Sequence, residues 1–200
     1  MSPLSSEQID KLRKDILLNV KIRNQALKFK TTWGLFSPRN IDEGSELLLN
    51  NIQVNKNDNI LDLGCGYGPI GLTLAKIACN GETLLVDKDF KAVEYTQKNI
   101  LLNQIDNASA LLSNGFDQVG HKRFHLIVSN IPAKVGNEML WLFLHDAYMS
   151  LEEGGRLVVV TISGLSKFMK REFKAQFGNY KKLKQGKTYT VAEAIKSQTQ

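Results

Sequence analysis

The sequence predicts an α/β fold built on a mostly parallel, doubly wound sheet, and three observations support this. From residue 59 onward, short buried apolar runs alternate with stretches of helical apolar spacing. A glycine-rich turn joins the first of these runs to the first helix. The chain closes with two further runs around Gln185-Gly186-Lys187, a pattern typical of an antiparallel hairpin. Parallel sheets tolerate such an antiparallel edge.

Seven strands follow from this pattern, with helices between them. The strands are expected at residues 60–63, 83–86, 108–112, 125–128, 156–162, 180–184 and 188–195. Helices are expected at residues 69–78, 89–103, 138–150 and 165–177. Pro69 suits a first helical turn, and Asp89 is a favourable N-cap.

The segment before residue 59 is organised differently. Residues 7–18 have helical apolar spacing, residues 26–36 look extended, and Leu47, Leu48 and Leu49 belong to a short helix. We expect a basic N-terminal extension over residues 1–30 and one catalytic domain over residues 31–200.

Composition places the chain among soluble globular proteins, with 42% hydrophobic and 23% charged residues. No apolar run approaches the roughly 20 residues that span a bilayer. The first thirty residues do not resemble a secretory signal. Cys65 and Cys79 lack metal-ligand spacing, so we expect no metal, no disulfide and a cytoplasmic location.

The net charge of +6 is concentrated at the ends of the chain. Residues 1–30 carry seven basic and three acidic side chains, and residues 166–200 carry nine and two. The segment between them is net acidic. These ends fit a polyanionic partner such as RNA, or they serve solubility alone.

The strongest chemical signal is the turn after the first strand. It contains Gly64, Gly66 and Gly68, which let the backbone turn sharply and let a ligand approach closely. Open α/β sheets bind ligands at this place, beyond the carboxyl end of a strand. Asp62 just before the turn can accept hydrogen bonds from a cationic amino group.

Three interpretations of this turn are open: a dinucleotide site, an S-adenosylmethionine site and a purely structural turn. Gly66, Gly68 and Gly71 form a G-x-G-x-x-G pattern, and Asp87 follows Gly66 by 21 residues, as in dinucleotide sites. However, Asp62 would repel a pyrophosphate and attract a methionine ammonium group. The sequence therefore favours the methyl donor over a nicotinamide cofactor.

The turn resembles the first two motifs of class I methyltransferases, and other segments narrow the resemblance. Thr32–Ser37 and Asp42–Leu49 are similar to T-x-x-G-[VL]-F-S and D-x-G-[ST]-x-L-L of small-subunit ribosomal RNA guanine-N2 methyltransferases and their small relatives, the small-methyltransferase (MTS) domain family. Ser113–Phe116 resembles the S-[ND]-x-[FY] of that family, and residues 129–136 its S-N-P-P-[FI]-x-x-G. The resemblance covers roughly residues 28–190 and implies a Rossmann-like methyltransferase fold.

The resemblance also implies roles for individual residues. Those expected around S-adenosylmethionine are Gly34, Phe36, Asp62, Gly64, Gly66, Gly68, Asp87, Lys88, Asn114 and Asn130. Asp87 would hold the ribose, Asn114 would face the adenine amino group, and Gly34 and Phe36 would close over the cofactor.

Asn130, Ile131 and Pro132 form the expected catalytic motif. The lone pair of an exocyclic amine is delocalised into the ring, which makes the amine a poor nucleophile. The side-chain oxygen of Asn130 and the carbonyl of Ile131 can accept its two hydrogens and turn its lone pair toward the methyl group. Such catalysis depends on positioning and oriented dipoles. Asn130 as an ordinary turn residue is the alternative.

Three departures from the family pattern bear on the substrate. Ile131 replaces a proline, Ala133 replaces a residue that is often aromatic, and His125 stands where aspartate is usual. We predict methylation of an exocyclic amine in RNA, with ribosomal RNA as the candidate substrate and a homodimer as the candidate assembly. The alternatives are the same fold acting on a small molecule or protein, or a protein that binds cofactor or RNA with weakened catalysis.

Overall fold

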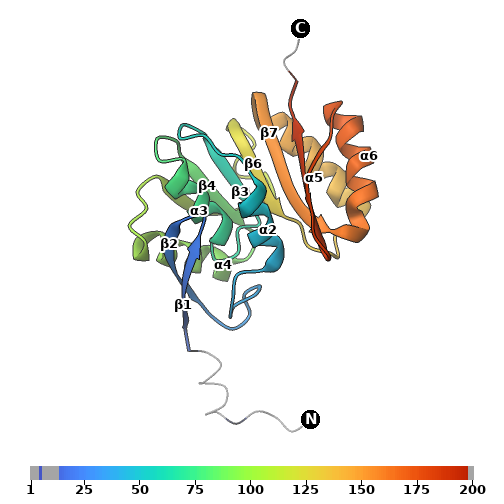
Figure 1. Ribbon diagram of the computed structural model, residues 1–200. Helices are drawn as coiled ribbons and strands as arrows, with labels where there is room; N and C mark the ends of the chain where they lie inside the picture. The colour runs from blue at the N-terminus through green and yellow to red at the C-terminus, as the bar shows by residue number, and fades with distance from the viewer. Residues whose placement is uncertain (1–4, 6–13, 198–200) are drawn as a thin grey trace.

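A computed structural model describes residues 5 and 14–197 of the 200-residue chain. Its centre is a seven-stranded sheet with the strand order β5-β4-β3-β6-β7-β9-β8 (Figure 1). The five strands β3 to β7 are parallel, and β9 pairs antiparallel with both β7 and β8. The bounds are β3 Ile60–Leu63, β4 Thr83–Asp87, β5 Ala108–Leu112, β6 Phe124–Asn130, β7 Leu151–Ile162, β8 Lys181–Gln185 and β9 Tyr189–Ile195.

Helices cover both faces of the sheet, and three of them connect successive parallel strands. The helices are α2 Glu43–Asn51, α3 Pro69–Ile77, α4 Phe90–Leu102, α5 Asn137–Ser150 and α6 Ser166–Phe177, with a short 3-10 turn at Ser163–Leu165. Pro69 opens α3, and the Asp89 side chain accepts from Lys91 N at the start of α4. The predicted fold class, with its hairpin finish, is confirmed.

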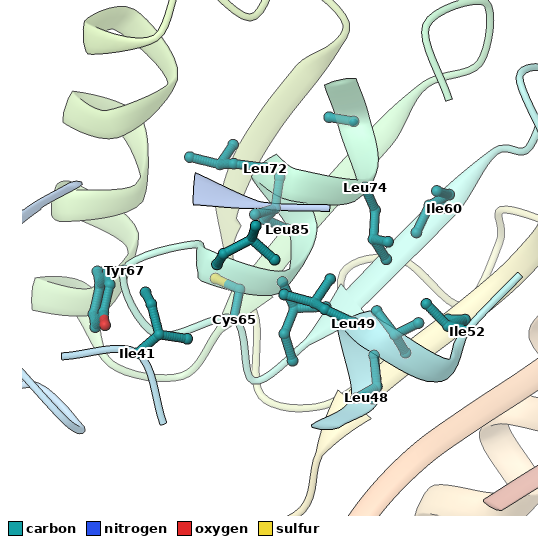
Figure 2. Packing of buried hydrophobic residues seen from close by; sticks show 14 of the residues in the cluster. Ile41, Leu48, Leu49, Ile52, Ile60, Cys65, Tyr67, Leu72, Leu74 and Leu85 are labelled. Carbon is teal, nitrogen blue, oxygen red and sulfur yellow. The ribbon is translucent and has the colours of Figure 1, made fainter. Parts of the chain in front are cut away.

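Two apolar cores lie on opposite faces of the sheet. Side chains at alternate positions of β3 divide between them, with Ile60 in one core and Leu61 in the other. The first core holds residues of α2, α3 and α4, among them Leu48, Leu72 and Tyr95, and Figure 2 shows part of it. The second core packs α5 and α6 against the sheet.

A separate hairpin precedes the sheet and corrects one prediction. β1 (Ile16–Ile22) pairs antiparallel with β2 (Gln25–Thr31). Residues 7–13 of the helix predicted over residues 7–18 lie outside the described residues, and residues 14 and 15 are not helical. Residues 16–18 are strand and not the end of a helix. Their alternating half-buried and exposed side chains fit a strand, and pairing with β2 satisfies their backbone. Residues 32–36, predicted as extended, form a turn instead, since β2 ends at Thr31 and Gly34 has φ +91°.

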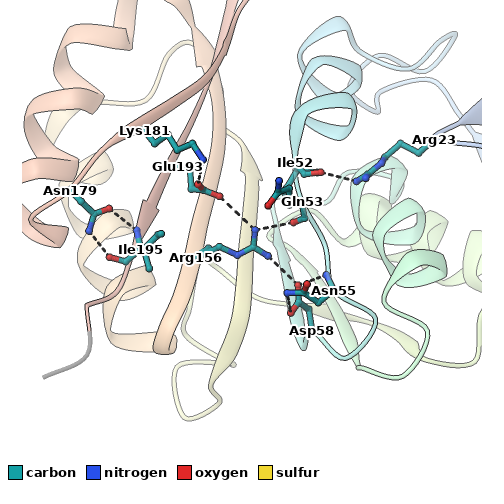
Figure 3. A network of polar contacts seen from close by, with 10 residues as sticks. All are labelled: Arg23, Ile52, Gln53, Asn55, Asp58, Arg156, Asn179, Lys181, Glu193 and Ile195. Carbon is teal, nitrogen blue, oxygen red and sulfur yellow. Dashed lines mark hydrogen bonds and ion pairs between the residues drawn. The ribbon is translucent and has the colours of Figure 1, made fainter.

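Arg156 ties the middle of the sheet to the segment before β3 (Figure 3). Its guanidinium donates to the carbonyl of Gln53 at 3.0 Å and to Asp58 Oδ2 at 3.2 Å, and it lies 3.6 Å from Glu193 on β9. Mostly buried ion pairs of this kind are stable only when every partner is satisfied. Within the described residues, no helix is long and apolar enough to cross a membrane.

Candidate active site

Three polar residues end neighbouring parallel strands on one face of the sheet. Asp62, Asp87 and Asn130 lie near the carboxyl ends of β3, β4 and β6. Alternation along each strand places them on the face that carries Ile60, Leu85 and Val128, which is the face covered by α2, α3 and α4. We call this end of the sheet, with the loops that leave it, the carboxyl edge.

The glycine turn leaves room at the carboxyl edge. Gly64 and Gly66 have φ +75° and +58°, which L-residues with side chains rarely adopt. A Cβ atom at either position would have no heavy-atom neighbour within 4 Å. A ligand can therefore approach the backbone of this turn directly.

Asp62 is buried with one oxygen unsatisfied. Its Oδ2 accepts from the backbone N–H of Gly71 at 2.7 Å, whereas Oδ1 is buried without a hydrogen-bond partner. Burial raises the pKa of Asp62 to about 7, the Gly71 bond opposes this, and the charge of Asp87 adds to it. A cationic donor at the turn would satisfy Oδ1, and this fits an ammonium group.

Asp87 joins the glycine turn to the end of β4. Its Oδ2 accepts from Gly66 N and its Oδ1 from Asp89 N, both at 2.9 Å. Each oxygen retains a second lone pair that can accept from a ribose hydroxyl. The carboxylate is only half-buried, so it is accessible to a ligand.

Side chains that the sequence analysis did not single out hold the turn in place. Thr96 Oγ1 donates to the Gly66 carbonyl at 2.8 Å, and Asn99 Nδ2 donates to the Tyr67 carbonyl at 2.9 Å. The Tyr67 hydroxyl lies 3.2 Å from the carbonyls of both Ser37 and Asn40. The turn is therefore fixed to α4 on one side and to the segment before α2 on the other. These polar residues of a helix and a turn carry no local sequence signal.

Asn130 is held from the other side by α2. Its Nδ2 donates to Asp42 Oδ2 at 2.8 Å and to Ser45 Oγ at 3.0 Å. The neighbouring Ser129 hydroxyl donates to the Leu63 carbonyl at 2.7 Å, which joins the end of β6 to the start of the glycine turn. The structure thus places Asn130 next to the turn, and it identifies Asp42 and Ser45 as partners that the motif alone did not reveal.

The remaining candidates occupy loops of the carboxyl edge. Ile131 is buried and its N–H donates to the Val160 carbonyl at 3.0 Å, whereas Pro132 is exposed. Lys88 is exposed after β4, and exposed Asn114 lies 3.5 Å from Asp117 Oδ2 after β5. Gly34 and Phe36 are exposed between β2 and α2, with the Phe36 side chain 66% exposed. All of them border the same end of the sheet, and their roles stay predictions.

Comparison with known proteins agrees with this geometry. Residues 26–193 match the model of the methyltransferase small domain family. The uncharacterized protein YbxB of Bacillus subtilis is 32% identical over 142 residues, which are 70% of this chain and 71% of YbxB. The ribosomal RNA small subunit methyltransferase C of Hamiltonella defensa is 32% identical over 174 residues, and the large subunit methyltransferase G of Psychromonas ingrahamii is 26% identical over 191. The matched regions are 84% and 92% of this chain, respectively.

A solved structure shares the architecture. The Thermus thermophilus 16S rRNA N2 G1207 methyltransferase, solved with AdoMet and guanosine, superposes with a TM-score of 0.82 at 29% identity over 91% of this chain. The present chain spans about half the length of that enzyme and of the two ribosomal RNA methyltransferases. The family match favours the methyl donor over the dinucleotide. The chain belongs to the methyltransferase small domain family, whose cofactor is S-adenosylmethionine.

Proposed function

We propose that the protein is an S-adenosylmethionine-dependent methyltransferase that acts on an exocyclic amine of a base in RNA, with ribosomal RNA as the substrate class. The observation that carries this proposal is the Asn130 amide. Both bonds of its nitrogen run to the start of α2, and among the described residues no donor bonds to its oxygen, which can accept from an amine beside the glycine turn. The relatives that act on ribosomal RNA supply the substrate class.

Cofactor binding is assigned to residues of the carboxyl edge. Asp62 would accept from the methionine ammonium group, Gly64, Gly66 and Gly68 would let the cofactor lie against the backbone, and Asp87 would hold the ribose. Asn114 and Lys88 would border the adenine side, and Gly34 and Phe36 would cover the cofactor. When bound, the cofactor supplies a methyl group already activated by its positive sulfonium.

Catalysis by the chain itself consists of orientation. The Asn130 side-chain oxygen and the Ile131 carbonyl would accept the two amine hydrogens and direct the lone pair at the methyl group. Pro132 restricts the backbone after these acceptors. No strong base is required, since the amine proton can leave after the nitrogen has become positively charged. A base in structured RNA must first leave its stack.

An RNA substrate also agrees with the charges around the site. Arg39, Lys134 and Lys187 are exposed on three different loops of the carboxyl edge. The opposite end of the sheet exposes both signs of charge, with Glu82, Asp106 and Glu152 beside Lys56, Lys122 and Arg123. The support for an RNA substrate is therefore the position of the three cations next to the site. The exposed basic side chains of α6 can contact RNA phosphates; they are Lys167, Lys170, Arg171 and Lys174. RNA binding by the basic terminal segments, a homodimer and a cytoplasmic location remain predictions.

Calorimetric titration with S-adenosylmethionine, with NADH in parallel, tests the cofactor. We expect saturable binding of S-adenosylmethionine only, weakened about tenfold or more in Asp87→Ala because hydrogen bonds to a carboxylate are lost. Transfer of labelled methyl to ribosomal RNA then tests the substrate, and Asn130→Ala should lose turnover while keeping cofactor affinity. Binding of NADH alone, or undiminished turnover in Asn130→Ala, would contradict the proposal.

A further inference from the structure

The first turn of α2 and its N-cap residue contact the candidate catalytic residue Asn130. Asp42 is the N-cap of α2 and Ser45 lies three residues further along. We infer that Asp42 and Ser45 are positioning residues that set the orientation of the Asn130 amide, an inference that rests on the function just proposed.

The amide has only one orientation that satisfies these contacts. Its nitrogen carries two hydrogens, and the two acceptors Asp42 Oδ2 and Ser45 Oγ take one each, at 2.8 and 3.0 Å. The reversed amide would place Asn130 Oδ1 against a carboxylate that can only accept. Within the described part of the chain, no donor bonds to Oδ1. The contacts therefore fix which atom is the oxygen and leave it as an acceptor for a substrate amine.

Asp42 is itself tightly positioned. Its Oδ2 also accepts from Ser45 N at 3.1 Å, and the Tyr189 hydroxyl at the start of β9 lies 3.4 Å from its Oδ1. A Cβ atom on Gly44 would lie 2.9 Å from Asp42 Oδ2 and 3.1 Å from the Tyr189 ring. Packing against this carboxylate thus explains why glycine occupies position 44.

Helix capping alone does not account for these contacts. A cap requires one side-chain acceptor, and here Asp42 fulfils that role toward Ser45 N. The Ser45 hydroxyl adds nothing to the cap, yet it reaches across to Asn130 on β6. The first turn of α2 therefore does more than cap its own helix: Asp42 and Ser45 also bind the Asn130 amide on β6.

Substitutions that keep the N-cap of α2 distinguish an effect on the orientation of the Asn130 amide from an effect on the folding of the helix. Ser45→Ala removes one acceptor, and Asp42→Ser keeps an N-cap but is too short to reach Asn130. We expect kcat to fall about 10-fold and about 100-fold, respectively, because small misplacements of a catalytic group are costly. The Kd for S-adenosylmethionine should be unchanged. Asp42→Asn retains an oxygen acceptor and should restore most of the activity lost in Asp42→Ser, and exposed Glu43→Gln is the matched control.

The decisive comparison repeats Ser45→Ala and Asp42→Ser in an Asn130→Ala background, where the residual methyl transfer is followed with labelled S-adenosylmethionine. If these residues act through the Asn130 amide, neither causes a further loss of kcat there. Equal losses in both backgrounds would overturn the inference.

A second measurement needs no catalysis. The side-chain amide signal of Asn130, identified by its disappearance in Asn130→Ala, should exchange slowly with solvent and several-fold faster in Asp42→Ser. Fast exchange in the unmodified protein would overturn the inference. Absence of methyl transfer by the unmodified protein would instead refute the proposed function, and the exchange rates would still decide the orientation of the amide.

Discussion

At the scale of single residues, the titration of Asp62 has a consequence for cofactor binding. Burial raises the pKa of Asp62 to about 7, and an ammonium group binds only the ionised form. The cofactor amine, like other α-amino groups, loses its proton near pH 8 (about 7.7–8.0). We therefore expect affinity for S-adenosylmethionine to rise with pH toward about 7 and to decline above about 8, measured by calorimetry across pH 5.5–9.

The variant Asp62→Asn serves as the control for this profile. It should bind at least about tenfold more weakly at pH 7.5, because a charge-assisted bond is lost, and its affinity should not rise between pH 5.5 and 7. An acid limb that persists in Asp62→Asn would show that another group titrates.

The same titration affects stability with a definite sign. An unfolded aspartate titrates near pH 4 (about 3.9), so between pH 4 and 7 the native protein retains a proton that the unfolded chain has lost. The stabilisation from neutral Asp62 is complete below pH 4 and is lost as the pH rises through about 7. Urea unfolding at pH 5 and pH 8 should therefore show Asp62→Asn gaining stability relative to the unmodified protein as the pH rises.

Site residues differed in how visible they were in the sequence. Asp62 and Asp87 follow apolar runs directly and Asn130 follows one after Ser129, so strand ends and motif spacing located them. Asp42 and Ser45 reach Asn130 across 88 and 85 residues of chain. No local pattern predicts contacts between residues so far apart, because they arise only when α2 packs against β7 and β9, next to the end of β6.

At the scale of elements, two asparagines, Asn99 of α4 and Asn103 at its C-cap, bond to the free edge of β2 as a neighbouring strand would. Lys28 and Lys30 of β2 direct their backbone groups away from β1 toward α4. Asn103 accepts from Lys28 N and donates to its carbonyl at 2.8 and 2.7 Å, and Asn99 does the same for Lys30 at 2.7 and 3.0 Å. The edge of β2 is thereby covered, which binds the hairpin to the domain across the predicted boundary at residue 30.

Loss of the buried member of this pair should be the more damaging. Asn99→Ala leaves backbone groups of Lys30 and Tyr67 unpaired, and we expect about 3 kcal/mol less free energy of unfolding, measured in urea. Asn103 is partly exposed, so water can replace it and Asn103→Ala should cost about 1 kcal/mol. Equal effects of the two substitutions would contradict this account of how the hairpin is attached.

The elements from β3 onward were predictable because each has its own local signals. Asp89 caps α4, Pro69 opens α3, and apolar runs bounded by turn residues match the strands. β1 lacked such signals: Ile16 and Leu17 fit a helical spacing as well as a strand. Pairing with β2 decided between the two, and that pairing is a tertiary interaction.

At the scale of the whole molecule, the two ends of the sheet differ in what they offer a polyanion. Arg39, Lys134 and Lys187 surround the carboxyl edge, and the bonds of Tyr67 to Ser37 and Asn40 hold the loop of Arg39 against the glycine turn. The opposite end carries three exposed cations as well, Lys56, Lys122 and Arg123. The number of exposed cations therefore does not distinguish the two ends of the sheet. What distinguishes them is that only the cations of the carboxyl edge lie next to the candidate site.

Two triple variants with the same loss of charge test this difference. Replacing Arg39, Lys134 and Lys187 by glutamine should weaken binding to all RNA sequences alike. Because each lost phosphate contact removes about 0.7–0.9 from the slope of log K against log salt, the slope should fall by about 2 to 3. Replacing Lys56, Lys122 and Arg123 by glutamine should leave both quantities nearly unchanged, as measured by fluorescence anisotropy over a salt series. If both triples weaken binding equally, RNA association is a property of overall charge, and the carboxyl edge does not orient the substrate.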